Sequence, residues 1–329
     1  MANDLPVSQL PPVFTPMLAS METEPFDSDE YWFEVKWDGV RALVFCESGS
    51  TRLVSRSGRD MTHQYPEFSD LHRKIRLDNA VFDGEIIALD ENAKPSFELL
   101  QRRINLSRST DISRGVTSVQ LDLVLFDLVF ADGRWTGAEP LARRLDRLSS
   151  SIEFEERILR SEPVPGHGIA LFEAAKARGL EGVVAKRVLS PYLPGKRTKD
   201  WLKIKVVHSV DCVIGGWTPG LGSRGHSLGA LLAGVYEGRD LVYIGSVGTG
   251  FTDKTLNVVK KRLEALEASS CPFKSKPNLK GARWTRPEQV CEVEYREFTG
   301  GKKLRAPAFK GLRFDKPPQH CDLSQFSPH

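Results

Sequence analysis

The chain has 329 residues, of which 40% are hydrophobic and 27% charged, and its formal net charge is +3. This length exceeds one ordinary core and predicts a soluble protein of two domains. Apolar runs fall short of the roughly 20 residues that a membrane span needs, so no membrane association is expected. The five scattered cysteines lack CxxC spacing. They argue against a disulfide framework or a zinc site and favour a reducing cytosol.

The first part of the chain mixes strand-like and helix-like patterns after a proline-rich lead-in over residues 1–20. Strands are predicted at residues 31–46, 51–56, 80–90, 119–131 and 181–188. Apolar residues at helical spacing predict helices over 96–104, 141–148 and 170–179, and Gly179 supplies a C-cap signal. The segment 119–130 is nearly continuously apolar, as a strand covered on both faces would be. An α+β domain with mainly antiparallel sheets is therefore expected over residues 1–207.

Beyond residue 207 the pattern changes to short strands separated by glycine-rich turns. Strands are predicted at 210–217, 228–237, 240–247 and 290–298, with one helix over 252–268. Such a set suits a small barrel of the OB type over residues 208–329. We place the domain boundary near Val206–Ser209, with a short hinge.

Lys36 lies in the apolar, aromatic-rich run from Tyr31 to Phe45. Burial disfavours the charged form of an amine, and a neutral lysine amine is a nucleophile. Asp38 shares strand parity with Lys36, and Gly39 permits a turn or a close approach to a ligand. The segment therefore suggests a covalent-lysine enzyme. The alternative is a strand that ends in a polar Asp-Gly turn, with Lys36 extending to solvent.

Several other apolar segments carry charged residues that an ordinary buried strand would not favour. These residues are Asp83, Glu85, Asp127, Glu181, Lys186, Lys203 and Lys205. Each alone fits an exposed strand face or a turn. Together they supply lysines that can neutralise phosphoryl oxygens and carboxylates that can hold a divalent metal. This combination is typical of nucleotide chemistry.

The order of these segments resembles the covalent nucleotidyltransferases, which comprise ATP-dependent DNA ligases, RNA ligases and mRNA capping enzymes. The matching segments are Lys36–Gly39 with Arg41, 55–60, 83–85 with 126–129, 181–186, 201–205 and 304–316. Within the superfamily the chain is most similar to bacterial end-joining ligases, both the LigD ligase domain and stand-alone LigC-type relatives. One departure is Phe314, where that group usually has glutamate. The resemblance implies a nucleotidyltransferase domain of ATP-grasp-like antiparallel sheets with helices, followed by an OB-fold domain.

The resemblance also implies the reaction and its catalytic residues. Lys36 would attack the α-phosphorus of ATP and form a lysyl-AMP, and the AMP would pass to a DNA 5′-phosphate. A 3′-hydroxyl would then seal the strand and release AMP. Lys203 and Lys205 would contact the α-phosphate, and Asp38 would support the lysine or a metal.

Further residues acquire binding roles from the same resemblance. Glu34 and Phe126 are expected at the adenine, with Phe126 stacking on it, and Arg41 at the ribose or a phosphate. Nucleotide-binding roles also fall to Arg56, Glu85, Lys186, Arg305, Arg313 and Lys316. Arg305 and Lys316 would fold over the β- and γ-phosphates. Glu181 and Glu85 are the expected ligands of Mg²⁺ or Mn²⁺, between which the sequence does not choose.

The implied substrate is nicked or broken duplex DNA, held mainly through its phosphates. Candidate DNA contacts are Arg102, Arg103, Lys196, Arg197, Lys199, Arg224, Lys302 and Lys303. The family expectation is a monomer in the bacterial cytoplasm, associated with the nucleoid and assisted by a Ku-like end-binding protein. Two alternatives stay open: an RNA ligase or capping-type enzyme with the same lysine chemistry, and a non-catalytic DNA-binding relative.

Overall fold

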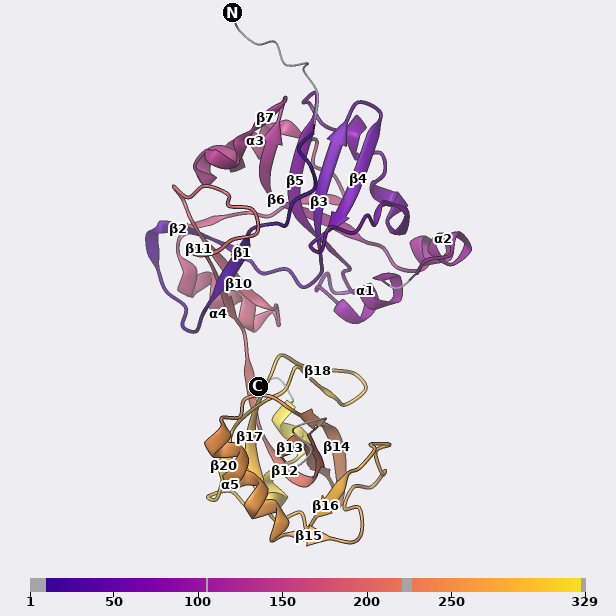
Figure 1. Ribbon diagram of the computed structural model, residues 1–329, viewed down its shortest axis with the longest axis vertical. Helices are drawn as coiled ribbons and strands as arrows, with labels where there is room; N and C mark the ends of the chain where they lie inside the picture. The colour runs from indigo at the N-terminus through magenta and orange to yellow at the C-terminus, as the bar shows by residue number, and fades with distance from the viewer. Residues whose placement is uncertain (1–9, 105, 221–226, 327–329) are drawn as a thin grey trace, which may run out of the picture. The chain divides into compact units, whose positions relative to one another are not determined.

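The computed structural model describes residues 10–104, 106–220 and 227–326. The chain divides into two compact units, Met1–Val206 and Val207–His329 (Figure 1). Each unit has its own hydrophobic core. We describe each unit by itself.

Two sheets form the first unit. The five-stranded sheet has the order β1 (Leu18–Glu22), β11 (Arg197–Lys205), β10 (Gly182–Arg187), β2 (Ser28–Val35) and β9 (Val164–Gly166). The other sheet has the order β4 (Ser50–Ser55), β3 (Val40–Glu47), β5 (Ala80–Ile87), β6 (Asp122–Ala131) and β7 (Arg134–Trp135), and β8 (Ile158–Arg160) pairs with β6. Only the β1–β11 and β6–β8 pairs are parallel among the described strands of this unit.

Strand β6 forms the centre of this unit, and all ten of its residues are buried. Leu123 and Leu125 pack into the core on one face, whereas Phe126 and Val129 pack into the core on the other. The predicted strand with both faces covered is confirmed.

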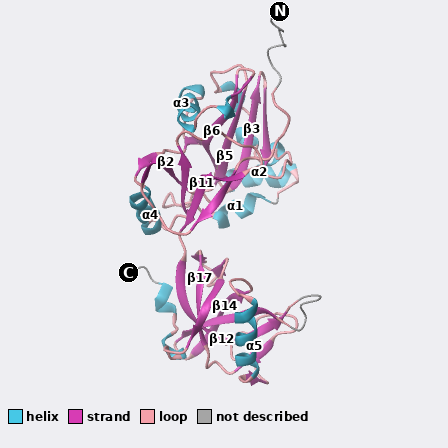
Figure 2. Ribbon diagram, turned by 60° about the vertical axis from the view of Figure 1, so that its left-hand side comes forward, coloured by secondary structure: helices cyan, strands magenta, loops and turns pink. Residues whose placement is uncertain are grey.

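The α-helices among the described residues of the first unit are α1 (Phe97–Ile104), α2 (Ser109–Ser118), α3 (Leu141–Ser151) and α4 (Gly168–Ala177). Helix α3 packs against β6 through Leu141, Leu145 and Leu148, the predicted apolar stripe. Helix α4 packs against β10 and β2, on the other sheet (Figure 2). The sequence did not predict α2, which is polar and contains Gly115.

The second unit is a seven-stranded sheet with one α-helix among its described residues, α5 (Asp253–Glu264). Its strands are β12 (His208–Pro219), β13 (Leu228–Glu237), β14 (Asp240–Val247), β15 (Glu267–Ala268), β16 (Arg283–Thr285), β17 (Val290–Tyr295) and β20 (Ala308–Arg313). A separate hairpin pairs β18 (Glu297–Phe298) with β19 (Leu304–Arg305). Strand β12 pairs with β17 along its first half and with β13 along its second half. It therefore connects the two parts of the sheet. The predicted α+β class, with a small OB-type barrel in the second unit, is confirmed.

One predicted strand differs from the structure in a way that creates the site. The run 31–46 is two strands, because β2 ends at Val35 and β3 begins at Val40 in the other sheet. A Cβ atom at Gly39 would collide with the carbonyl oxygen of Ile86, so only glycine fits this crossing. The shared strand parity predicted for Lys36 and Asp38 is therefore wrong, since both lie in the crossing segment.

Candidate functional site

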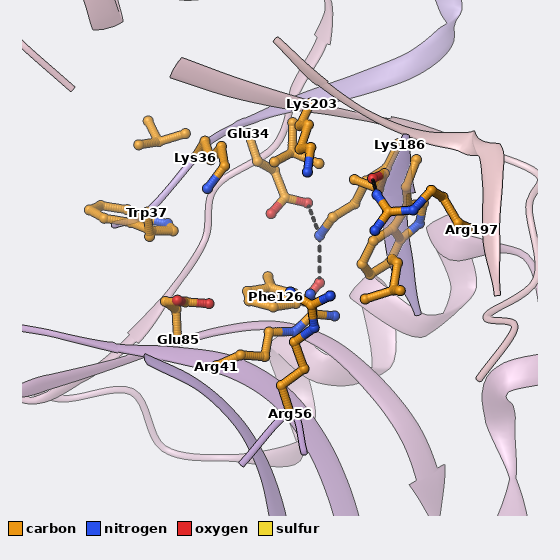
Figure 3. A pocket seen from close by; sticks show the side chains of 15 residues that line it. Glu34, Lys36, Trp37, Arg41, Arg56, Glu85, Phe126, Lys186, Arg197 and Lys203 are labelled. Carbon is orange, nitrogen blue, oxygen red and sulfur yellow. Dashed lines mark hydrogen bonds and ion pairs between the residues drawn. The ribbon is translucent and has the colours of Figure 1, made fainter. Parts of the chain in front are cut away.

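A pocket lies between the two sheets of the first unit, and Figure 3 shows the side chains that line it. The five-stranded sheet contributes Glu34, Val184, Lys186, Arg197, Trp201 and Lys203, and the other sheet with its loops contributes Arg41, Arg56, Glu85 and Phe126. Lys36 and Trp37 enter from the segment that crosses between the sheets. The structure therefore brings together most of the nucleotide-site residues that the sequence predicted in this unit.

Lys36 is held at the pocket by its backbone and by its amine. Its backbone N–H donates to the carbonyl oxygen of Gly182 at 2.9 Å, and its Nζ donates to Glu181 Oε2 at 2.5 Å. The other carboxylate oxygen of Glu181 lies 3.2 Å from Lys205 Nζ. Glu181 therefore bridges the side chains of Lys36 and Lys205, and its carboxylate fixes the position of the Lys36 amine.

Lys186 joins the two sheets from inside the pocket. Its Nζ donates to Glu34 Oε1 at 2.7 Å and to the carbonyl oxygen of Phe126 at 3.0 Å, the two dashed contacts of Figure 3. Both charged side chains are only 3% exposed. Burial raises the pKa of Glu34, and the charge of Lys186 opposes this rise. A charged, hydrogen-bonded pair thus lies where the adenine was expected.

Arg41 is anchored by a buried carboxylate that the sequence did not assign to it. Its Nε and Nη2 donate to the two carboxylate oxygens of Asp83 at 2.7 and 2.5 Å. Asp83 also accepts from the hydroxyl of Tyr192 at 2.5 Å. The Arg41 side chain keeps 18% of its surface exposed. The bidentate pair therefore fixes the guanidinium while leaving part of it accessible from the pocket.

Phe126 stands in a cluster of aromatic rings and cations. Its ring meets Trp201 edge to face, with centroids 6.3 Å apart. Lys186 Nζ and the Arg41 guanidinium lie over the ring at 4.6 and 4.9 Å from its centroid. Both cations lie within the range of a favourable cation–π contact, which fixes the orientation of the ring.

Two titratable groups of the pocket have a pKa shifted from its ordinary value. Burial raises the pKa of Glu85 to about 7, against the opposing charges of Arg41 and Lys36. Burial, and then the neighbouring charge of Lys205, lowers the pKa of Lys203. An anion bound here would favour the charged form of Lys203, and a bound cation would favour the charged form of Glu85.

The raised pKa of Glu85 predicts a pH dependence of stability. Between its ordinary value of 4.5 and about 7, the folded chain holds a proton on Glu85 that the unfolded chain has lost. The free energy of unfolding should thus fall as pH rises through this window, by about 1 to 3 kcal/mol, since one pKa unit corresponds to about 1.4 kcal/mol. In urea unfolding, the free energy of unfolding should differ less between pH 5 and pH 8 in Glu85→Gln than in wild type. The exposed Glu91→Gln serves as control, and an unchanged pH dependence in Glu85→Gln would contradict the assignment.

Several predicted residues do not line the described pocket. Asp38 is absent from its lining. Arg305, Arg313 and Lys316 belong to the second unit, where acidic residues hold them. Arg305 pairs with Glu297 at 3.3 Å, and Lys316 pairs with Asp211 at 2.8 Å. Arg313 pairs with Asp315 and Asp211 at 2.7 and 3.3 Å.

The predicted DNA contacts divide into accessible and buried residues. Arg103 as a DNA contact is wrong, because its side chain is 0% exposed and pairs with Glu67 beneath the surface. The exposed candidates are Arg102, Lys196, Arg197, Lys199, Lys302 and Lys303, and Arg197 also lines the pocket. Arg224 lies outside the described residues.

No individual role was predicted for Tyr192, and its partner Asp83 was predicted only as one of the carboxylates that could hold a metal. Asp83 carried a signal, since it is a charged residue inside an apolar strand next to Glu85. Tyr192 lies in the segment 190–197, which resembles that of bacterial end-joining ligases, but a tyrosine in a proline-rich loop predicts no contact with a particular strand. Asp127 was grouped with the nucleotide-site residues, yet the structure pairs it with Arg144 in the core, both side chains 0% exposed.

Comparison with known proteins yields two family matches. Residues 16–205 match the model described as ATP dependent DNA ligase domain, and residues 224–316 match ATP dependent DNA ligase C terminal region. In the part of the chain that the structure describes, no helix is long and apolar enough to cross a membrane.

The curated relatives and the solved structures that match the chain include DNA ligases and proteins with a ligase domain. The chain is 36% identical over 312 residues to a multifunctional non-homologous end joining protein LigD of Mycolicibacterium smegmatis, covering 94% of this chain and 39% of the relative. It is 32% identical to DNA ligase C1 of the same organism, covering 98% of this chain and 95% of that one. A solved structure of mycobacterial DNA ligase D complexed with ATP and MES matches with a TM-score of 0.53 at 34% identity, covering 94% and 97% of the two chains. The chain thus spans about two fifths of the length of its LigD relatives.

Proposed function

The chain belongs to the family of ATP-dependent DNA ligases, and on this premise we propose that it seals broken DNA strands through an AMP group carried on Lys36. The observation that carries the proposal is the position of the Lys36 amine, which lines the pocket and is held by Glu181 beside Lys205. We propose that residues 1–207 are the adenylation domain and that residues 208–329 are the OB-fold domain.

The proposed reaction consists of three phosphoryl transfers. The neutral Lys36 Nζ attacks the α-phosphorus of ATP, so that an N–P bond forms, the bond to pyrophosphate breaks and the amine loses a proton. A 5′-phosphate oxygen of DNA then attacks the same phosphorus and releases Lys36. Finally a 3′-hydroxyl attacks the 5′-phosphate, forms the phosphodiester and releases AMP. The protein chiefly positions groups and neutralises charge.

The residues around the pocket divide these tasks. Lys203 and Lys205 are proposed at the α-phosphate, where an anion would be stabilised by both charges. Phe126 would stack on the adenine, and Arg41 would meet the ribose or a phosphate. Glu34 with Lys186 would recognise the base, and Arg56 would approach the nucleotide or the DNA. Asp38 retains its proposed role near the lysine or a metal.

We propose that a divalent cation binds between Glu85 in the pocket and Glu181 beside it. Glu85 and Glu181 offer hard oxygen donors. Burial and the charge of Glu181 disfavour ionisation of Glu85, and a bound cation would offset both. Among the described residues no group of three or more His, Cys, Asp or Glu could hold a metal. Phosphate oxygens would therefore complete the ligand set, as is usual for Mg²⁺. A bound Mg²⁺ or Mn²⁺ would neutralise charge on the phosphates.

The second unit supplies cations to the same reaction in this proposal. Arg305, Arg313 and Lys316 would meet the β- and γ-phosphates of ATP during the first step. Each now pairs with a carboxylate, so binding the triphosphate would require these pairs to exchange partners.

Labelled nucleotides test the function directly. Purified protein with Mg²⁺ or Mn²⁺ should form an acid-labile adduct with labelled ATP and seal a nicked duplex. Exclusive formation of a GMP adduct would instead favour the capping-type alternative. Absence of any adduct would favour the non-catalytic relative. A nick with a DNA or an RNA 3′ terminus would establish which strand is preferred.

The printed names of the LigD relatives refer to non-homologous end joining, and we extend this role to the chain as a proposal. Duplex ends, aligned by a Ku-like end-binding protein, would then be substrates beside simple nicks. We further propose a monomer acting in the bacterial cytoplasm at the nucleoid. Addition of a Ku-like protein should accelerate end sealing more than nick sealing, and equal acceleration of both would contradict this extension.

A further inference from the structure

The hydroxyl of Tyr192 connects two segments that lie far apart in the sequence. Tyr192 belongs to the β10–β11 loop, residues 188–196, and its side chain is buried. Its hydroxyl donates to Asp83 Oδ2 at 2.5 Å and accepts from the backbone N–H of Met17 at 3.1 Å. The loop thereby meets strand β5 and the N-terminal lead-in at one oxygen atom.

The same two partners of Tyr192 hold the guanidinium of Arg41. Asp83 accepts from Arg41 Nε and Nη2, and the carbonyl oxygen of Met17 accepts from Arg41 Nη2 at 3.1 Å. The contacts therefore form a closed ring: Arg41 to Asp83, Asp83 to Tyr192, Tyr192 to Met17, and Met17 back to Arg41. Both residues that anchor Arg41 here also contact the Tyr192 hydroxyl, Asp83 through its carboxylate and Met17 through its backbone N–H.

The surroundings of Tyr192 keep its phenol protonated, so that it can donate in this set of contacts. Burial raises the pKa of the Tyr192 phenol well above its usual value, and the charge of Asp83 acts in the same direction. The phenol consequently stays protonated and donates to the carboxylate. Asp83 is 0% exposed, so water cannot replace a lost donor without opening the core.

Tyr192 also supports the aromatic side of the pocket. Its ring meets Trp201 edge to face at 5.7 Å, and Trp201 in turn meets Phe126 at 6.3 Å. The Tyr192 hydroxyl contacts the residues that hold Arg41, whereas its aromatic ring packs toward Phe126 through Trp201. Removing the oxygen alone therefore tests the effect on Arg41 and leaves the aromatic packing in place.

We propose that Tyr192 is a positioning residue for nucleotide binding, whose hydroxyl holds Arg41, through Asp83 and Met17, at the place where ATP is bound. The inference rests on the proposed function. Arg41 lines the pocket directly, whereas Tyr192 does not. Tyr192 therefore acts on the nucleotide through the geometry of the guanidinium.

The variant Tyr192→Phe tests this inference, with Tyr65→Phe as a matched control. Tyr65 is buried in the same unit, outside the pocket lining, and loses the same atom. Tyr192→Phe should raise the KM for ATP in AMP-adduct formation about tenfold, and kcat should stay within about threefold. Tyr65→Phe should leave KM unchanged. Equal KM values for Tyr192→Phe and wild type would overturn the inference, even if the melting temperature fell.

A double-variant cycle tests whether the effect passes through Arg41. Equilibrium ATP binding should weaken in Tyr192→Phe and in Arg41→Met, yet adding Tyr192→Phe to Arg41→Met should weaken it no further. Additive losses would overturn the inference. If Tyr192→Phe does not fold, Asp83→Asn replaces it in the same cycle with the same two outcomes. If wild type forms no AMP adduct the proposed function fails, whereas a normal wild type with an unaffected Tyr192→Phe refutes this inference alone.

Discussion

Replacing Lys36 by alanine is expected to abolish formation of the AMP adduct, with a loss of at least about a thousandfold in rate. The amine is the only atom of the side chain that can form the N–P bond, so no neighbouring group restores the reaction by position alone. Lys36→Arg should fail as well, because a guanidinium stays protonated and is a poor nucleophile. The measurement is transfer of label from α-labelled ATP to protein.

The third chemical step supplies an internal control for this prediction. Sealing of a nick whose 5′ end already carries AMP needs no lysine nucleophile, so Lys36→Ala should retain measurable activity on that substrate. The exposed Lys254→Ala should behave like wild type in both assays. Loss of both activities in Lys36→Ala would indicate a folding defect instead. Retention of adduct formation would show that another residue carries the AMP.

Local patterns predicted those parts of the fold that local physics determines. The apolar run of β6 and the stripe of α3 follow from burial at strand and helix spacing. Some residues of the candidate site were likewise predicted because they are charged residues inside an apolar strand, as are Glu85 and Lys186. Burying a charged side chain costs free energy unless a ligand or another residue pairs with it. A charged residue inside an apolar strand can therefore be recognised in the sequence.

Contacts between distant segments could not be predicted in the same way. The crossing at Lys36–Gly39 depends on β2 and β3 joining different sheets, and nothing in the run 31–46 specifies this change. A charged residue in a strand also does not reveal whether its partner is a ligand or another buried side chain. Asp127 and Glu85 carry the same sequence signal, yet they serve the core and the pocket respectively.

Asp127→Ala is expected to destabilise the first unit by about 3 to 5 kcal/mol, because it leaves Arg144 as an unpaired buried cation. Arg144 donates to both carboxylate oxygens of Asp127 at 2.7 and 3.0 Å, and both side chains are 0% exposed. Arg144 also donates to the carbonyl oxygens of Glu139 and Ser190 at 2.5 and 2.9 Å. Urea unfolding monitored by tryptophan fluorescence gives the free energy of unfolding. Asp70→Ala, which breaks an exposed pair with Arg73, should change it by less than about 1 kcal/mol.

The double variant Asp127→Leu with Arg144→Met decides whether the pair acts through charge or through packing. It removes both charges and fills similar space, so part of the lost stability should return. Recovery should be incomplete, because the carbonyl oxygen of Glu139 loses the Arg144 donor, whereas that of Ser190 still accepts from the backbone N–H of Leu141. At 10 °C, where Asp127→Ala should remain partly folded, its KM for ATP should stay within about threefold of wild type, since Asp127 does not line the pocket. A large rise in the KM for ATP at unchanged stability would show that Asp127 contributes to nucleotide binding.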